Sequence, residues 1–330
     1  MINEIEFNKG INKLKRDSFQ KFCFFGLGCE NEKIIKAHSI QENKILSNIS
    51  EEGKVLHVCH EIDEGGLSFD FKIIGKGIAS TFTGFCKTHD TKIFQPIEIY
   101  DYQFGNKEQE FLFAYRALAI GHFKKKYHEH VINLLYRSIL ANDLEAIYKY
   151  FPQFNNLSSE YMFKLGLAKS AIEETCRKLE KLRSSFNTNL KNKKYHHIET
   201  KVIVYEIEYH IAVSSYIILP YDFEGRKLNS SVPIFLSVFP ENGKTYVLLS
   251  YLKKESNFLN FLDSQLFEQS PDFQRKALSN IIARYVSNFY LSPIRWAHLS
   301  RTEKEKTLRL LNKCLSSTPN DNRIDINLFY

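Results

Sequence analysis

The sequence predicts an α+β fold with an N-terminal metal-bound unit, a helical middle and a C-terminal antiparallel sheet packed with helices. Three observations lead to this prediction: two Cys/His pairs near the start, a helical apolar period in the middle, and a period of two residues further on. The 330 residues, 43% of them hydrophobic, are enough for about two ordinary cores. The expected domains are 1–105, 106–198 and 199–330.

The N-terminal part contains two separated pairs of soft or borderline metal ligands. Glycines at positions 26 and 28 let the backbone reverse within the first pair, and two residues separate the second pair, as in a zinc turn that starts a helix. Six cysteines are too few for a disulfide scaffold, which favours a metal. The alternative is four unrelated buried residues. The predicted ligands of a structural zinc ion are Cys23, Cys29, Cys86 and His89.

Short strands and one helix are expected between the ligand pairs. Apolar residues at helical spacing indicate a helix over 39–50, and turn residues at 63–66 separate two strand-like runs that would pair as a hairpin. Cys59 and His60 form a competing metal pair, but adjacent strand residues point to opposite faces. The other expected elements are a strand at Lys33–His38, hairpin strands at Lys54–Cys59 and Leu67–Ile74, a loop at Gly75–Phe85, and a helix starting around Cys86–His89.

The remaining two thirds change from helical to strand periodicity. Apolar residues recur every three or four positions first, and every second position after about 199. The predicted helices are 107–150, 158–186, 256–267, 271–289 and 302–315. The predicted strands are 200–219, 232–239 and 245–251. Asn242-Gly243 reads as a hairpin turn, Ser292-Pro293 as a helix start, and the single tryptophan, Trp296, as part of a helix–sheet contact.

The charge balance permits contact with nucleic acid or another acidic surface. The formal net charge is +7 at pH 7, although a simple positive balance on a soluble protein explains this equally well. Three lysines beside an aromatic residue and two histidines at 124–130 suit a phosphate-contacting patch; the alternative is a solvated helix face. The candidate nucleic-acid contacts are Lys36, Lys87, Lys124, Lys125 and Lys126.

The sequence shows no pattern of export or of membrane insertion. The N-terminal residues lack a basic segment followed by an apolar one. No apolar run approaches the ~20 residues that span a bilayer. We therefore expect a cytoplasmic protein with no membrane partner.

Two motifs resemble those of the HNH-type treble-clef nucleases, the ββα-metal family. Lys36-Ala37-His38-Ser39-Ile40 is similar to the first family motif, and Phe85-Cys86-Lys87-Thr88-His89-Asp90 to the last. In that family a zinc-bound turn carries a strand ending in histidine and a closing helix. The pattern AHSIQ…ASTFTGFCKTHD…PIE, from Ala37 to Glu98, is also similar to a group of bacterial proteins with no assigned function.

The resemblance implies a metal-dependent endonuclease that cuts DNA or RNA, and a role in bacterial anti-phage defence is part of this expectation. His38 would be the general base, assisted by Mg²⁺ or Mn²⁺. Ala37 stands where the family has an acidic residue, and residues 79–85 contain no asparagine. Thr83 and Asp90 would then help to hold the catalytic ion. The alternatives are that His38 only caps or packs, and that the chain is a non-catalytic zinc module binding nucleic acid or a partner protein.

Overall fold

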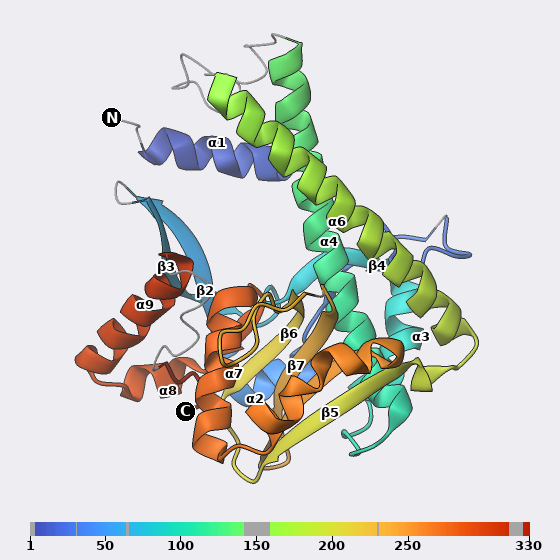
Figure 1. Cartoon of the computed structure of the whole chain (residues 1–330), viewed down its shortest axis with the longest axis vertical. Coiled ribbons are helices and arrows are strands. Elements are labelled where there is room, and N and C mark those ends of the chain that lie inside the picture. The colour runs from blue at the N-terminus through green and yellow to red at the C-terminus, as the bar shows by residue number, and fades with distance from the viewer. Residues whose placement is uncertain (1–3, 31, 64–65, 142–158, 230, 317–325) are drawn as a thin grey trace.

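A seven-stranded antiparallel sheet forms the centre of the protein in the computed structural model (Figure 1). The structure describes residues 4–30, 32–63, 66–141, 159–229, 231–316 and 326–330. The strand order is β3-β2-β9-β6-β7-β8-β5. The strands are β2 (Lys54–Asp63), β3 (Gly66–Gly75), β5 (Ile198–Tyr205), β6 (Ile211–Ile218), β7 (Pro233–Glu241), β8 (Lys244–Leu252) and β9 (Phe289–Leu291). The mixed composition of helix and antiparallel sheet confirms the predicted α+β class.

Both faces of the sheet are covered, because successive residues of its strands point to opposite sides. In β7, Phe235 and Phe239 join one buried cluster, whereas Leu236 and Val238 join the other. The first cluster includes the middle helix α4 and the N-terminal unit, and the second includes α7 (Pro271–Tyr285). The sheet therefore separates two cores.

Two long helices, α4 (Lys107–Leu140) and α6 (Ser159–Lys191), pack side by side and project beyond the sheet (Figure 1). Asn106 caps the start of α4, where its side chain accepts hydrogen bonds from the backbone N–H groups of Glu108 and Gln109. The stretch from Gln109 to Ile120 is buried on all sides. This part of α4 is therefore a central core helix, as its nearly continuous apolar sequence requires.

A two-stranded antiparallel pair and a helix form the N-terminal unit. Strand β1 (Ile34–His38) pairs with β4 (Thr81–Cys86), and α3 (Lys87–Glu98) follows β4 directly. The β2–β3 hairpin is inserted between β1 and β4 and continues into the main sheet through β9. The main sheet thus joins strands from both sides of the boundary predicted at residue 105. The division into three domains stays a prediction.

The other described helices are all shorter than α4 and α6. The remaining α-helices are α1 (Glu4–Asp17), α2 (Ser47–Ile49), α8 (Pro293–His298) and α9 (Arg301–Ser316), and the short π- and 3-10 helices are η1 (Glu42–Leu46), η2 (Tyr195–His197), η3 (Lys253–Leu259) and η4 (Asp263–Phe267). Ser292 caps α8 as predicted, and Trp296 on that helix stacks 4.3 Å from Phe71 of β3, the helix–sheet contact expected for it. Within the described residues, every helix falls short of the length and apolar character needed to cross a bilayer.

Several predicted elements were wrong in detail. The expected loop over 75–85 contains strand β4, and the expected single strand over 200–219 is two strands, β5 and β6, which are not neighbours in the sheet. The basic segment at 124–130 lies inside the continuous helix α4, and the predicted helix over 271–289 ends at Tyr285 so that β9 can begin. The predicted helix over 39–50 is a π-helical turn followed by α2.

Candidate metal centre

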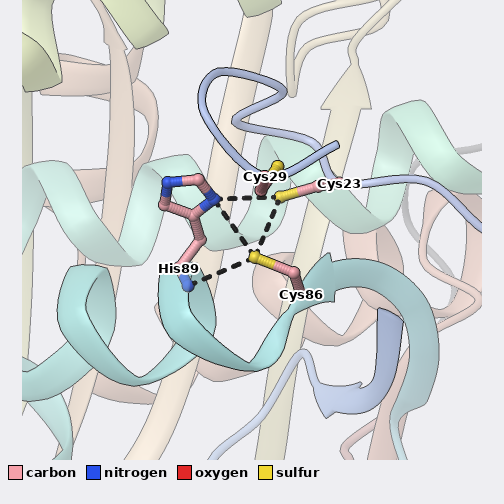
Figure 2. A group of neighbouring side chains, drawn as sticks. All are labelled: Cys23, Cys29, Cys86 and His89. Atoms are coloured by element: carbon pink, nitrogen blue, oxygen red, sulfur yellow. Dashed lines mark hydrogen bonds between the residues drawn. The ribbon is translucent and has the colours of Figure 1, made fainter. Parts of the chain in front are cut away.

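The first ligand pair lies on the irregular segment that precedes β1. Gly26 and Gly28 both have positive φ, at 72° and 67°, the left-handed conformation that glycine adopts without strain. These two turns fold the backbone back on itself, so that the sulfurs of Cys23 and Cys29 lie close together (Figure 2). The sequence prediction that the glycines shape this turn is confirmed.

The second ligand pair lies where β4 passes into α3. Cys86 is the last residue of β4 and the N-cap of the helix, and its sulfur accepts a hydrogen bond from the backbone N–H of His89, 3.4 Å away. The first helical turn brings the side chain of His89 back over Cys86 (Figure 2). Because β1 and β4 are paired, this turn lies beside the segment that carries the first pair.

The four side chains converge at distances that suit a tetrahedral zinc ion. Their ligand atoms all lie within 4.8 Å of one another. The Cys23 and Cys86 sulfurs are 3.8 Å apart, and His89 Nδ1 is 3.4 Å from the first and 3.2 Å from the second. Zn–S bonds of ~2.3 Å and Zn–N bonds of ~2.0 Å at tetrahedral angles would give roughly 3.8 Å and 3.5 Å. This Cys3His group can hold a metal ion such as zinc.

The electrostatics of the cluster also suit a cation. Burial, together with the neighbouring Cys23 and Cys86, raises the pKa of the Cys29 thiol to about 12, and burial raises the pKa of Cys86. Three thiols this close become thiolates when a divalent ion compensates their charge. Burial lowers the pKa of His89, which keeps its imidazole in the neutral form that binds metals.

Helix α6 holds the first ligand pair in place from 160 residues further along the chain. Arg183 Nε donates to the Phe24 carbonyl at 2.6 Å, and Asn187 Nδ2 donates to the carbonyls of Phe24 and Phe25 at 3.1 and 3.0 Å. The Asn187 oxygen in turn accepts from the Tyr115 hydroxyl of α4 at 2.6 Å. We call Arg183 and Asn187 the α6 clasp. It fixes the backbone on which Cys23 is carried.

His38 lies at the other end of the β1–β4 pair from the cluster. Its Cα pairs with that of Thr81, whereas Cys86 pairs with Ile34. The imidazole is mostly buried, with its Nδ1 3.4 Å from Ser80 Oγ and its Nε2 3.3 Å from Glu42 Oε2. Burial lowers the pKa of His38, although Glu42 and a hydrogen bond to the Ala79 carbonyl act against this. His38 is thus a neutral, oriented imidazole outside the metal cluster.

A buried polar network supports the segment around His38. Ser80 has a positive φ of 58°, and its hydroxyl bonds to both the carbonyl and the N–H of Ile40. Its backbone N–H donates to the Tyr290 hydroxyl of β9 at 2.7 Å. Asn288 donates to Ser39 at 3.0 Å. The main sheet therefore helps to fix the end of β1.

The two other predicted catalytic residues lie in different surroundings. Thr83 is buried, and its hydroxyl donates to the Gln20 carbonyl at 2.7 Å. Burial raises the pKa of Asp90 to about 6, with Arg116 opposing the shift, and its Oδ1 has no hydrogen-bond partner among the described residues. Arg116 itself pairs with Glu98 and lies 4.0 Å above the Phe94 ring.

The predicted nucleic-acid contacts fall into two groups. Lys36 on β1 and Lys87 at the start of α3 are exposed. On α4, Lys124 donates to the carbonyl and hydroxyl of Ser287, and Lys126 pairs with Glu129 at 2.9 Å. Lys125 lies between these two and is partly exposed. Much of the predicted lysine patch on α4 is therefore engaged within the protein.

The competing pair, Cys59 and His60, lies on β2. Cys59 lies outside the cluster, with its thiol 3.4 Å from the Asp70 carbonyl, while the side chain of His60 lies outside the described residues. Glu42 contacts His38, and only its position four residues further along the sequence could have indicated this contact. No pattern in the sequence indicates the α6 clasp, since it depends on a contact between residues about 160 positions apart.

Comparison with known proteins found no family model, no curated protein and no solved structure that matches the chain.

Proposed function

We propose that this chain is a metal-dependent endonuclease of the HNH-like type, built on a zinc-stabilised treble clef. The order of the elements supports this proposal: a turn with two cysteines, a β-strand pair, and a helix that begins with Cys-x-x-His. The zinc would be structural, because all four ligands come from the protein and leave no open position.

The proposed general base is His38, and its setting is the observation that carries the proposal. A neutral ring donates from one nitrogen and keeps a lone pair on the other, and a water molecule would reach this lone pair by replacing the contact with Ser80 or Glu42. Burial keeps His38 neutral near pH 7, and Ser80 and Glu42 hold its orientation. A base poised in this way suits hydrolysis of a phosphodiester.

A magnesium or manganese ion would stabilise the charge that develops on the phosphate. Thr83 bonds within the protein, so its hydroxyl is not available to this ion as first predicted. The described residues contain no second group of three converging metal-binding side chains. Glu42 beside His38 would be its protein ligand, since magnesium commonly relies on one or two carboxylates, water and substrate phosphates.

A plasmid-nicking assay with Mg²⁺ or Mn²⁺ tests the proposal. We expect His38→Ala to reduce cleavage at least ~100-fold, the usual minimum contribution of a general base. His196→Ala is the matched control, because His196 is an exposed histidine on η2 away from β1. Cleavage by His38→Ala at the rate of the wild type would exclude His38 as the base.

The second candidate is a non-catalytic zinc module that binds nucleic acid or a partner protein. It is favoured by the contacts of His38, since both ring nitrogens already face protein groups. This reading predicts that neither the wild type nor His38→Ala nicks DNA or RNA, while both bind the polymer equally. The predicted role in anti-phage defence is tested separately, by comparing phage plating on cells that express the wild type or His38→Ala.

A further inference from the structure

A groove runs along α6 next to the turn that carries the first ligand pair. Its walls come from residues 25–27 on one side and residues 180–192 of the helix end on the other. The exposed face of α6 from Glu174 to Ser184 shares Glu180 and Ser184 with this groove and continues it along the helix. Together they follow roughly 27 Å of helix, at 1.5 Å per residue.

The lining of this α6 groove is positively charged. Five basic residues against two carboxylates, Glu174 and Glu180, give a local charge of +3. Glu174 is paired with its helix neighbours, and Glu180 with His122 and Arg183. The basic residues are Arg177, Lys178, Lys181, Arg183 and Lys191.

Two of these cations are available to a ligand. Lys181 and Lys191 are exposed and have no acidic partner among the residues that the structure describes. They lie ten residues apart on one helix, a spacing of ~15 Å. A chain with charges repeated along its length can reach both of them, whereas a small anion can reach only one.

The groove is also rigid and has an apolar rim. The α6 clasp fixes the turn opposite the helix, so the walls are held before any ligand arrives. Leu27 is 55% exposed on this rim. Phe25 packs on the ring of His89, with centroids 4.5 Å apart, and so joins the groove to the metal centre.

We propose that the α6 groove binds a single strand of nucleic acid, with phosphates on Lys181 and Lys191 and a base or sugar against Phe25 and Leu27. Cation-lined grooves with apolar platforms recognise single strands in this way. An acidic peptide would use the cations but leave the apolar rim uncovered. The inference takes the polymer class from the proposed function, but it concerns binding outside the His38 site.

The test measures binding of fluorescein-labelled single-stranded DNA and RNA to the full chain without Mg²⁺ or Mn²⁺, across a series of salt concentrations. The test variant is Lys181→Gln with Lys191→Gln. The matched control is Lys227→Gln with Arg309→Gln, which removes two exposed cations that do not line the groove. Circular dichroism and zinc content verify that each variant is folded.

We expect the groove variant to bind about tenfold more weakly, with a slope of log K against log salt shallower by ~1.4, since each phosphate contact contributes ~0.7 for a single strand. The control should match the wild type. Equal loss in both variants would show that only net charge matters and would overturn the inference, as would equally tight binding of a poly-glutamate peptide. Unchanged binding by His38→Ala with lost cleavage separates this inference from the proposed function.

Discussion

At the residue scale, Cys86 combines two tasks: its sulfur belongs to the Cys3His group and also caps α3. Serine is among the best N-cap residues, so Cys86→Ser keeps the cap and removes a good zinc ligand. We expect the variant to purify with less than about half a zinc per chain and to melt more than ~10 °C lower, because structural zinc contributes folding free energy. Elemental analysis and thermal denaturation measure both effects.

Cys59→Ser is the control for this substitution. Cys59 lies on β2, outside the cluster, so its loss should leave the zinc content unchanged. Full zinc occupancy in Cys86→Ser would contradict the assignment of the metal centre.

The convergence of Cys23, Cys29, Cys86 and His89 is the part of the site that the sequence predicted well. Each pair is local, with a glycine turn or a helix start that fixes its geometry, so the spacing alone indicates the ligands. The surroundings of His38 were not predictable, since Ser80 reaches the imidazole through strand pairing and Tyr290 reaches Ser80 through sheet formation. Contacts between distant segments leave no periodic mark in a sequence.

At the scale of elements, the α6 clasp should control how firmly the centre holds its ion. Asn187→Ala removes two hydrogen bonds to the carbonyls of Phe24 and Phe25 without touching a ligand. We expect zinc to pass to a chromogenic chelator several-fold faster, since each lost buried hydrogen bond costs about 1 kcal/mol. Asn189→Ala on the same helix is the control, because the Asn189 side chain donates to the Ser185 carbonyl within α6. Equal rates in both variants would exclude the clasp from this role.

The contact between α4 and α6 should also make stability depend on pH. His122 is 2% exposed, and its Nε2 donates to the Glu180 carboxylate at 2.9 Å. Burial lowers the pKa of His122, and Glu180 opposes this shift. The unfolded chain therefore binds the proton first, near pH 6.5, and stability is lost as the pH falls below that value.

The measurement compares urea denaturation of the wild type and His122→Gln at pH 7.5 and 5.5. The difference in unfolding free energy between the wild type and His122→Gln should be smaller at pH 5.5 by up to about 1.4 kcal/mol. This limit is the effect of one proton over the one pH unit between the unfolded pKa near 6.5 and pH 5.5. His130→Gln, which changes an exposed histidine of the same helix, should show no such change. A pH-independent difference would contradict the neutral, buried state of His122.

The wrongly predicted elements share one physical cause. Gly75, Gly77 and Gly84 favoured a loop, yet Thr81–Cys86 becomes a strand because β1 offers it a pairing edge. The three residues of β9 are too few for a visible period and gain strand geometry from β2 and β6 on either side. In both cases tertiary pairing overrides local propensity.

At the scale of the whole molecule, the N-terminal unit shares its core with the rest of the chain. Phe24 and Phe94 pack against Tyr115 of α4, with ring centroids 5.2 and 6.0 Å apart, and β2 pairs with β9. We therefore expect the fragment 1–105 to stay unfolded even with zinc, although its four ligands are present. Circular dichroism and NMR dispersion test this, with the full chain as reference. A well-dispersed spectrum of the fragment would support an independent N-terminal domain.

The insertion of the β2–β3 hairpin between the two ligand pairs has a consequence for synthesis on the ribosome. The last ligand, His89, is made 200 residues before Phe289, the first residue of the strand that pairs with β2. At ~5–20 residues per second, the β2–β3 segment waits roughly 10–40 s for the strand that pairs with it. Early capture of zinc would tether both ends of this waiting segment, so metal supply during translation would govern the yield of correctly assembled chains.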